Sequence, residues 1–251
     1  MFAVYDEAAR LQTGQLERTE RSWRQTWTGD DRATVLYRGE SGAPEGYAIV
    51  RYRADLPITE RFLEVEERVW LTLGAQRGIY AWLSSLGDQW RELVYRAHPE
   101  EGFGDRLNEP RLPPLSAPGW GLWFPSATLL RGPMFRLLDV PGALAARTAA
   151  PEAEGVELTL AVHVEDRHIP ENRGPWRVRL EGGRIEVEPF RGGPVDASFS
   201  LPVDTLSRIY IAALQPWQAL AGGWATIDRP EVVPALDAAL RLPRPWMFDR
   251  F

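Results

Sequence analysis

The sequence predicts an α+β fold divided into two domains, residues 1–132 and residues 133–251. Two observations support this prediction. In the first part, helical apolar spacing is followed by three strand-like segments, a helix and another strand, which predicts a mixed sheet. In the second part, a run of strands precedes a run of helices, which is typical of a separate α+β domain. A chain of 251 residues is long enough to bury two modest cores.

The first domain begins with helical apolar spacing over Val4–Trp27, interrupted at Gly14. Four strands are expected next, and they lie at residues 33–38, 45–53, 62–71 and 92–96. A loop rich in Gly and Pro, residues 39–44, joins the first two strands as a hairpin. A helix is expected at residues 79–86, between the third and fourth strands.

The second domain is expected to contain five strands, at residues 134–140, 156–164, 176–180, 184–188 and 197–201. Gly182 and Gly183 predict a tight hairpin turn. Four helices are expected, at residues 142–147, 205–214, 216–221 and 231–240. The first of these helices has Pro141 at its start and Asp139 near its cap.

The composition excludes several kinds of chemistry. The chain has no cysteine, so disulfides, thiolate metal sites and cysteine nucleophiles are ruled out. All 29 basic residues are arginine, so Schiff-base and P-loop lysines are ruled out as well. The Walker A, Gly-x-Gly-x-x-Gly, Gly-x-Ser-x-Gly and His-Glu-x-x-His motifs are also absent. The sequence therefore gives no support for an NTPase, a dinucleotide-binding enzyme, a hydrolase with a nucleophile elbow or a zinc protease.

Charge and hydropathy indicate a soluble, cytoplasmic protein. The net charge of −6 argues against a nucleic-acid partner, which needs a broad basic footprint. No run of about 18 apolar residues is present, so no membrane span is expected. Asp6, Glu7 and Arg10 do not fit a secretion signal.

The run Leu137-Leu138-Asp139-Val140-Pro141-Gly142-Ala143-Leu144 resembles the start of the sterol-carrier-like (SCP2-like) C-terminal domain of the Eis (enhanced intracellular survival) family of acetyltransferases. The resemblance extends to Phe2–Trp23, Glu45–Ala48 and Leu206–Ala213. The element order of the first domain is similar to that of the GNAT acetyltransferase fold. The resemblance implies acetyl-CoA-dependent N-acetylation of amines, including aminoglycosides and lysine side chains, by trimers or hexamers.

The resemblance also implies that the first domain is a degenerate, non-catalytic GNAT-like domain. A catalytic GNAT domain binds the pyrophosphate of CoA at a small-residue turn between a strand and a helix. Here Ala75, Gly78 and Tyr80 occupy that place, and Tyr80 would crowd the phosphates. The plain alternative is an ordinary helix start. We therefore expect that no cofactor binds to this chain, and that the domain that binds acetyl-CoA in the complete enzyme precedes Met1.

Three site residues are implied by the resemblance. The terminal carboxylate of Phe251 matches the family's terminal carboxylate, which would act as the general base toward a protonated amine. Trp23 and Asp166 match positions that line the family's substrate cavity. The alternatives are a packed aromatic terminus, a core tryptophan and a solvated carboxylate at a strand end. Arg250, beside the terminal residue, would repel a polycationic substrate.

No metal site is expected. His163 and His168 flank Glu165 and Asp166, which is a set of possible ligands. On a strand, however, His163 and His168 point to opposite faces, so the two side chains do not converge.

The expected function is that of the middle and C-terminal part of an Eis-like N-acetyltransferase, which is inactive without the N-terminal GNAT domain. Whether this chain is an enzyme by itself is left open. Two alternatives are a stand-alone SCP2-like binder of a hydrophobic ligand and an oligomerisation module. Four tryptophans are expected to fill the second domain and leave no lipid tunnel. They are Trp176, Trp217, Trp224 and Trp246.

Overall fold

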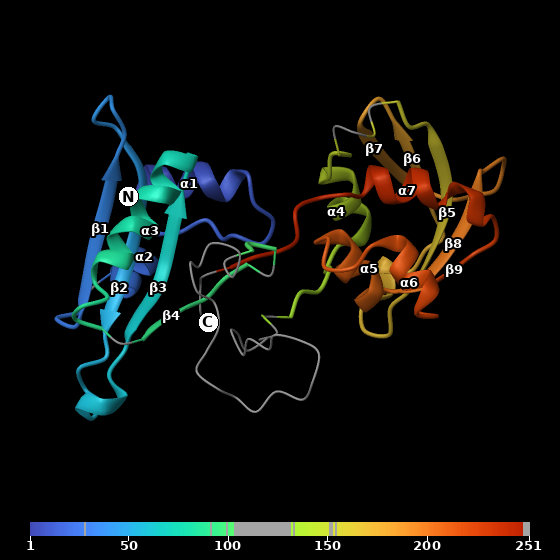
Figure 1. The fold of residues 1–251 in the computed structure, drawn as a ribbon. Coiled ribbons are helices and arrows are strands. Elements are labelled where there is room, and N and C mark those ends of the chain that lie inside the picture. The colour runs from blue at the N-terminus through green and yellow to red at the C-terminus, as the bar shows by residue number, and fades with distance from the viewer. Residues whose placement is uncertain are drawn as a thin grey trace, which may run out of the picture. The chain divides into compact units, whose positions relative to one another are not determined.

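The computed structural model describes residues 1–27, 29–90, 92–98, 100–102, 132, 134–150, 153 and 155–247. The chain divides into two compact units, and the change from one to the other falls close to residue 132 (Figure 1). Each unit combines its own sheet with helices. The predicted α+β fold class is therefore confirmed.

The first unit contains a four-stranded sheet in the order β1-β2-β3-β4. Strands β1, β2 and β3 are antiparallel neighbours, whereas β4 pairs with β3 in parallel. The strands are β1 Arg32–Arg38, β2 Pro44–Tyr52, β3 Leu63–Trp70 and β4 Leu93–Tyr95. The helices are α1 Phe2–Arg10, α2 Glu20–Trp27 and α3 Leu73–Ser85, and the short 3-10 helix η1 spans Ile58–Glu60.

Both faces of this sheet are covered by helices. Tyr47 and Ile49 of β2 pack in one core with residues of α1. Ala48 and Val50 pack in a second core with Ile79 of α3. Because side chains alternate along a strand, β2 is buried on both sides, which explains its apolar sequence.

A β-bulge in β3 directs two neighbouring charged residues into different cores. Val50 pairs with Val65, but Ile49 pairs with Glu67, so the residue between the two partners on β3 is extra. The alternation of faces restarts after the bulge, which turns Glu67 toward the α1 side and Arg68 toward the α3 side. Glu67 is 2% exposed and Arg68 is 4% exposed.

The predicted helix over residues 4–27 is in fact two helices, α1 and α2. The residues between them have no helical structure over most of their length. The Tyr5 hydroxyl of α1 donates a hydrogen bond to the Leu16 carbonyl at 2.8 Å, which ties this connecting segment to α1. Such a tertiary bond leaves no signal in the apolar spacing.

The second unit contains a five-stranded sheet in the order β7-β6-β5-β8-β9. Strands β5 and β8 are parallel, and the other neighbours are antiparallel. The strands are β5 Leu158–Glu165, β6 Trp176–Glu181, β7 Arg184–Pro189, β8 Ala197–Pro202 and β9 Thr226–Ile227. The helices are α4 Val140–Ala146, α5 Val203–Tyr210, α6 Pro216–Ala221 and α7 Val233–Ala239, with 3-10 helices η4 Pro170–Asn172 and η5 Pro230–Val232.

One face of this sheet packs on the helices, which gather on one side of it (Figure 1). Leu160, Val162 and Val164 of β5 point into the resulting core. His163 and Glu165 alternate with them and are exposed on the other face. The outward face of β5 is therefore the polar one.

The predicted strand at residues 134–140 is wrong, because none of these residues pairs in a sheet, Leu138 lies in a bend and α4 begins at Val140. Its backbone N–H groups bond to side chains instead. The N–H of Leu137 donates to Ser207 Oγ at 2.9 Å, and the N–H of Val140 donates to Asn172 Oδ1 at 2.8 Å. The short strand β9 was not predicted. None of the described helices is both long and apolar enough to cross a membrane.

Candidate functional site

Asp166 follows β5 directly and is 2% exposed. Its Oδ1 accepts hydrogen bonds from the backbone N–H groups of His168 at 2.9 Å and Ile169 at 3.1 Å. Arg136 donates to the same oxygen at 2.6 Å, and Asn172 Nδ2 donates to Oδ2 at 2.9 Å. The carboxylate is thus engaged by four donors. This arrangement supports a structural role, and contact of the carboxylate with a substrate stays a prediction.

These donors hold the pKa of Asp166 well below its usual value. The hydrogen bond from the Asn172 side chain is the largest cause, the backbone N–H groups of the following turn add to it, and the charge of Arg136 acts in the same direction. The cluster also positions its neighbours. Arg173 Nε donates to the Asp166 backbone carbonyl at 2.6 Å. Asn172 in turn accepts from the N–H of Val140, so the end of β5 is tied to the start of α4.

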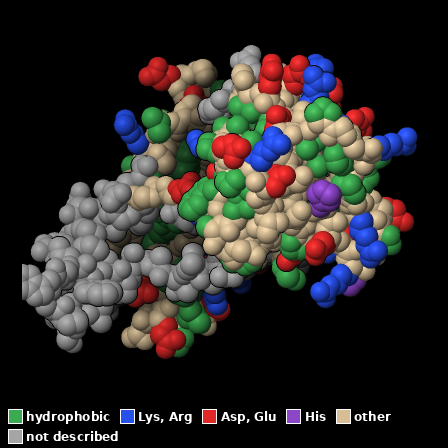
Figure 2. Space-filling model, turned by 90° about the vertical axis from the view of Figure 1, so that its right-hand side faces the viewer, with side chains coloured by type: hydrophobic (Ala, Val, Ile, Leu, Met, Phe, Trp, Pro, Cys, Tyr) green, Lys and Arg blue, Asp and Glu red, His purple; other side chains and the backbone are tan. Residues whose placement is uncertain are grey.

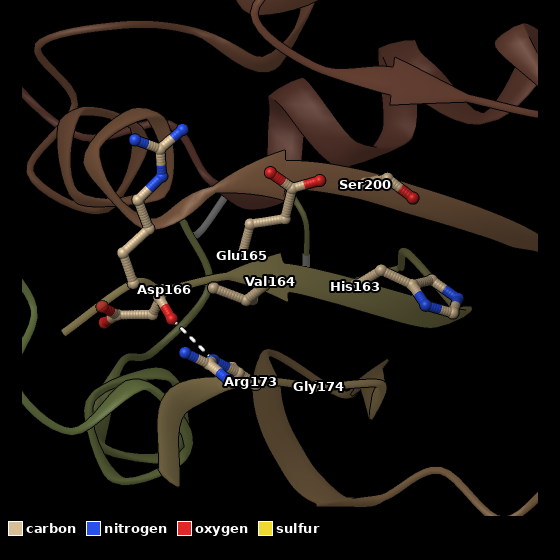
Figure 3. A pocket seen from close by; sticks show the side chains of 8 residues that line it. His163, Val164, Glu165, Asp166, Arg173, Gly174 and Ser200 are labelled. Carbon is tan, nitrogen blue, oxygen red and sulfur yellow. Dashed lines mark hydrogen bonds between the residues drawn. The ribbon is translucent and has the colours of Figure 1, made fainter. Parts of the chain in front are cut away.

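An open depression with a volume of about 520 Å³ lies over this end of β5 (Figure 3). It is lined by His163–Arg167, by Arg173 and Gly174 before β6, and by Ser200 of β8. His163 and Ser200 are partners in the parallel register of β5 and β8. Of these residues, the sequence singled out only His163, Glu165 and Asp166. Arg173 and Ser200 were missed, because a loop and a cross-strand pairing bring them here.

Trp23, the second predicted substrate residue, lies in the core on the α1 side of the first unit and is 4% exposed. Its ring meets Tyr5 edge-on at 5.2 Å and lies 4.7 Å from the Phe2 ring. The Arg18 guanidinium stacks on it at 4.6 Å. The same guanidinium forms a buried pair with Glu67 at 2.6 Å. These contacts support a packing role for Trp23, and its contact with a substrate stays a prediction.

The predicted CoA-binding turn lies inside a helix. Helix α3 begins at Leu73 rather than residue 79, because Thr72 caps it by accepting a hydrogen bond from the N–H of Ala75 at 3.1 Å. Gly78 is therefore a residue of the helix interior and not a helix start. A Cβ at Gly78 would lie 2.3 Å from the Tyr37 ring, so close packing explains this glycine.

The N-terminus of α3 already has an internal anion beside it. The Thr72 hydroxyl donates to Glu45 Oε2 at 2.8 Å. The N–H of Gln76 is also taken, since it donates to the Thr72 carbonyl at 3.0 Å. An external phosphate at this helix end would meet a carboxylate of the protein, which opposes the attraction that a helix N-terminus offers to anions.

A buried ionic cluster links β3 to the residues that follow β4. Arg68 of β3 donates to the Arg96 carbonyl at 2.5 Å and to the carboxylate of Glu101. Glu101 also accepts from the Tyr80 hydroxyl, and the Tyr95 ring stacks on Arg68 at 4.1 Å. The Arg68 and Glu101 side chains are 3% and 8% exposed. Tyr80 thus contributes a hydrogen bond to the buried pair of Arg68 and Glu101.

Phe251, the third predicted site residue, lies outside the described residues, so the position of its carboxylate is untested. Trp246 groups with the first unit, and its ring lies 5.9 Å from the His98 ring. Within the described residues, no group of three or more His, Asp or Glu side chains is arranged to hold a metal ion.

The expectation that four tryptophans fill the second unit is wrong for three of them, because Trp246 groups with the first unit and two others are exposed. Trp217 is 52% exposed and Trp224 is 47% exposed. The buried core of this unit is formed mainly by Leu, Val, Ile and Ala side chains. The aromatic content therefore gives no argument about a lipid tunnel.

Comparison with known families assigns both halves of the chain. Residues 14–137 match the family model of the acetyltransferase (GNAT) domain, and residues 140–248 match that of the sterol carrier protein domain. The chain therefore consists of a GNAT acetyltransferase domain followed by a sterol carrier protein domain. The predicted fold of both parts is confirmed.

The match to a curated relative extends over both domains of this chain. An uncharacterized N-acetyltransferase of Streptomyces griseus subsp. griseus is 26% identical over 99% of this chain, and the match covers 58% of that protein. The chain thus spans less than two thirds of the length of this curated relative.

Three solved structures have the same fold. A GCN5-related N-acetyltransferase of Anabaena variabilis has a TM-score of 0.77 at 21% identity and covers 100% of this chain and 59% of its own. A probable N-acyltransferase of Enterococcus faecalis has a TM-score of 0.78 at 17% identity, with 100% and 58% covered. Eis1 of Mycobacterium abscessus has a TM-score of 0.67 at 21% identity, with 100% and 59% covered.

Proposed function

We propose that this chain is the middle and C-terminal part of an Eis-like, acetyl-CoA-dependent N-acetyltransferase. The observation that carries the proposal is that nearly the whole chain matches 58% of an N-acetyltransferase, while its own residues match a GNAT domain followed by a sterol carrier protein domain. In this proposal the cytoplasmic enzyme acetylates an amine. The acetyl-CoA site belongs to a further GNAT domain of the longer protein.

Two features of the first unit support a non-catalytic role for its GNAT domain. The carboxylate of Glu45 lies at the N-terminus of α3, where a pyrophosphate would bind. The ionic cluster of Arg68 and Glu101 ties β3 to the residues that follow β4. Both features would have to rearrange before a long cofactor could lie along these elements. The chain alone is therefore proposed to be inactive.

The terminal carboxylate of Phe251 is proposed as the general base that accepts the proton of the amine. The test uses a longer protein in which an acetyl-CoA-binding GNAT domain precedes this chain. A C-terminal extension by two glycines moves the carboxylate, whereas amidation of an unextended terminus removes its charge in place. Because a base acts in the transition state, both changes should lower kcat more than they raise KM. Full kcat in the extended protein would contradict the proposal.

The protein is also proposed to form a homo-oligomer, a trimer or hexamer. The exposed rings of Trp217 and Trp224 support self-association, because exposed aromatic side chains are enriched in interface cores. Light scattering at micromolar concentration tests the point. A clean monomer at every concentration would count against it.

A further inference from the structure

The depression at the end of β5 holds two arginine side chains that have no acidic partner. Arg167 and Arg173 both line it, and both are exposed. Within the described part of the chain, neither forms an ion pair. Arg173 is held in place because its Nε donates to the Asp166 carbonyl at 2.6 Å. Its two terminal nitrogens remain as donors in a fixed fork, which suits a carboxylate or a phosphate.

The carboxylate of Asp166 does not cancel this positive charge. Asp166 is enclosed, and its two oxygens accept from two backbone N–H groups, from Asn172 and from Arg136. Its charge is already matched by the Arg136 guanidinium at 2.6 Å. Asp166 acts here as a positioning residue, because its backbone carbonyl orients Arg173.

The strands supply groups of the opposite character. Glu165 is exposed and, apart from Asp166, is the acidic residue of the lining. His163 lies two residues before it on the same outward face, and Ser200 lies across from His163 on β8. Figure 3 shows these three side chains along the two strands, with Arg173 on the segment that precedes β6. The depression therefore offers an anion-binding fork and one accessible carboxylate.

The wider surface does not determine which ion binds. Acidic and basic side chains are interspersed on the face that Figure 2 shows. A surface of mixed charge produces no strong field at a distance, so the groups in contact with a ligand decide its charge.

We propose that this depression binds a small amine that carries its own acid group. The carboxylate or phosphate of the ligand would lie against Arg173 and Arg167, and its ammonium group against Glu165. The identification of this ligand with the acetyl acceptor rests on the proposed function. The acceptor would then be a zwitterionic amine and not a polycation, because a polycation would face two guanidinium groups and one free carboxylate.

The chain contains three histidines, so the imidazole signals of a proton NMR spectrum can report binding directly. Single His→Gln variants assign them. The probes are β-alanine and phosphoethanolamine as carboxylate and phosphate zwitterions, inorganic phosphate as the anion alone, and spermidine as a polycation. Both zwitterions should shift the His163 signal saturably, and more tightly than phosphate or spermidine.

A pair of matched variants tests the role of the guanidinium. Arg173→Gln should weaken zwitterion binding by about tenfold or more, because it removes a charge-assisted pair of hydrogen bonds. Arg184→Gln is the control, since Arg184 is exposed on β7 and is not among the residues that line the depression. It should leave the affinity unchanged.

Three results would overturn the inference: no saturable shift with either zwitterion, tighter binding of spermidine or of phosphate alone, or equal affinity in the Arg173→Gln variant. The inference and the proposed function fail separately. If the zwitterions do not bind to the depression, the inference fails, and acetyl transfer by the longer protein is tested by a separate measurement. Binding here without acetyl transfer of the same compounds by the longer protein would leave a ligand site that is not the acceptor site.

Discussion

Replacing Arg147 by methionine should destabilise the second unit strongly. Arg147 is 7% exposed and joins two helix ends through backbone carbonyls. Its guanidinium donates to the carbonyls of Ile209 at 3.3 Å and Tyr210, at the end of α5, and of Leu240 at 2.6 Å, at the end of α7. The carbonyl ends of helices attract cations, so this position suits a positive charge. No carboxylate among the described residues pairs with it.

The size of the effect follows from two opposing contributions. Burial lowers the pKa of Arg147 from 12.5 to about 10, which corresponds to a charge-burial cost of roughly 3 kcal/mol. Hydrogen bonds from a charged donor contribute about 1.5–3 kcal/mol each, so the three bonds together exceed this cost. Methionine also leaves the carbonyls without a donor. The free energy of unfolding should therefore fall by about 2–4 kcal/mol.

Hydrogen exchange followed by mass spectrometry measures this change within the intact chain. Peptides that cover α5 and α7 should exchange faster in Arg147→Met. Arg179→Met is the control, because Arg179 pairs with Glu181 at the surface, where both side chains are 54% exposed. It should change stability by no more than about 0.5 kcal/mol. Equal exchange of α5 and α7 in the two variants would refute the role of Arg147 as a link between helix ends.

Gly78→Ala should destabilise the first unit by about 1–3 kcal/mol in thermal unfolding, because its Cβ has no room. Gly74→Ala in the same helix should be neutral or stabilising; equal effects would contradict the packing argument. Burial raises the pKa of Tyr47 and Tyr95. The unfolded chain therefore loses these protons at a lower pH than the folded chain, and the first unit should lose stability as pH rises above about 10. After an alkaline pH jump, ionisation of all 7 tyrosines without a slow phase would refute this. Asp166→Asn should lower the free energy of unfolding at neutral pH. The gap in this free energy between the variant and the native chain should shrink as pH falls below 3.8, because the pKa of Asp166 is lower in the folded than in the unfolded chain. A gap in urea unfolding that does not change with pH would contradict this.

The strands of both sheets other than β9 could be predicted to within a few residues, because their apolar content and turn residues are local signals. The strand at 134–140 could not be judged correctly. The segment is rich in apolar residues, yet the N–H groups of Leu137 and Val140 bond to Ser207 and Asn172, which are distant in sequence. The local sequence pattern does not indicate hydrogen-bond partners that are distant in sequence.

The burial of the charged residues of β3 could not be predicted from the sequence either. Glu67 and Arg68 lie in the predicted strand at residues 62–71, and a β-bulge places each of them in a separate core. A bulge shifts the alternation by one residue and is not marked by any residue type here. The ionic cluster that Arg68 forms with Glu101 was therefore not predictable.

The candidate site was only partly predictable. The carboxylate of Asp166 could be named from a resemblance, but its enclosure depends on the loop that carries Asn172 and on Arg136 from a distant segment. Arg173 was not predicted as a site residue, because no sequence pattern distinguishes it from the other arginines among the 29. Its position follows from the turn that Asp166 holds.

The proposal that this GNAT domain is not the cofactor site is tested most directly by titrating acetyl-CoA into the chain alone in an isothermal calorimeter. The structure of α3, with Glu45 at its N-terminus, predicts no saturable binding. The matched control is the longer protein that includes a further GNAT domain, which should bind acetyl-CoA under the same conditions. Micromolar binding of acetyl-CoA to the chain alone would contradict the proposal.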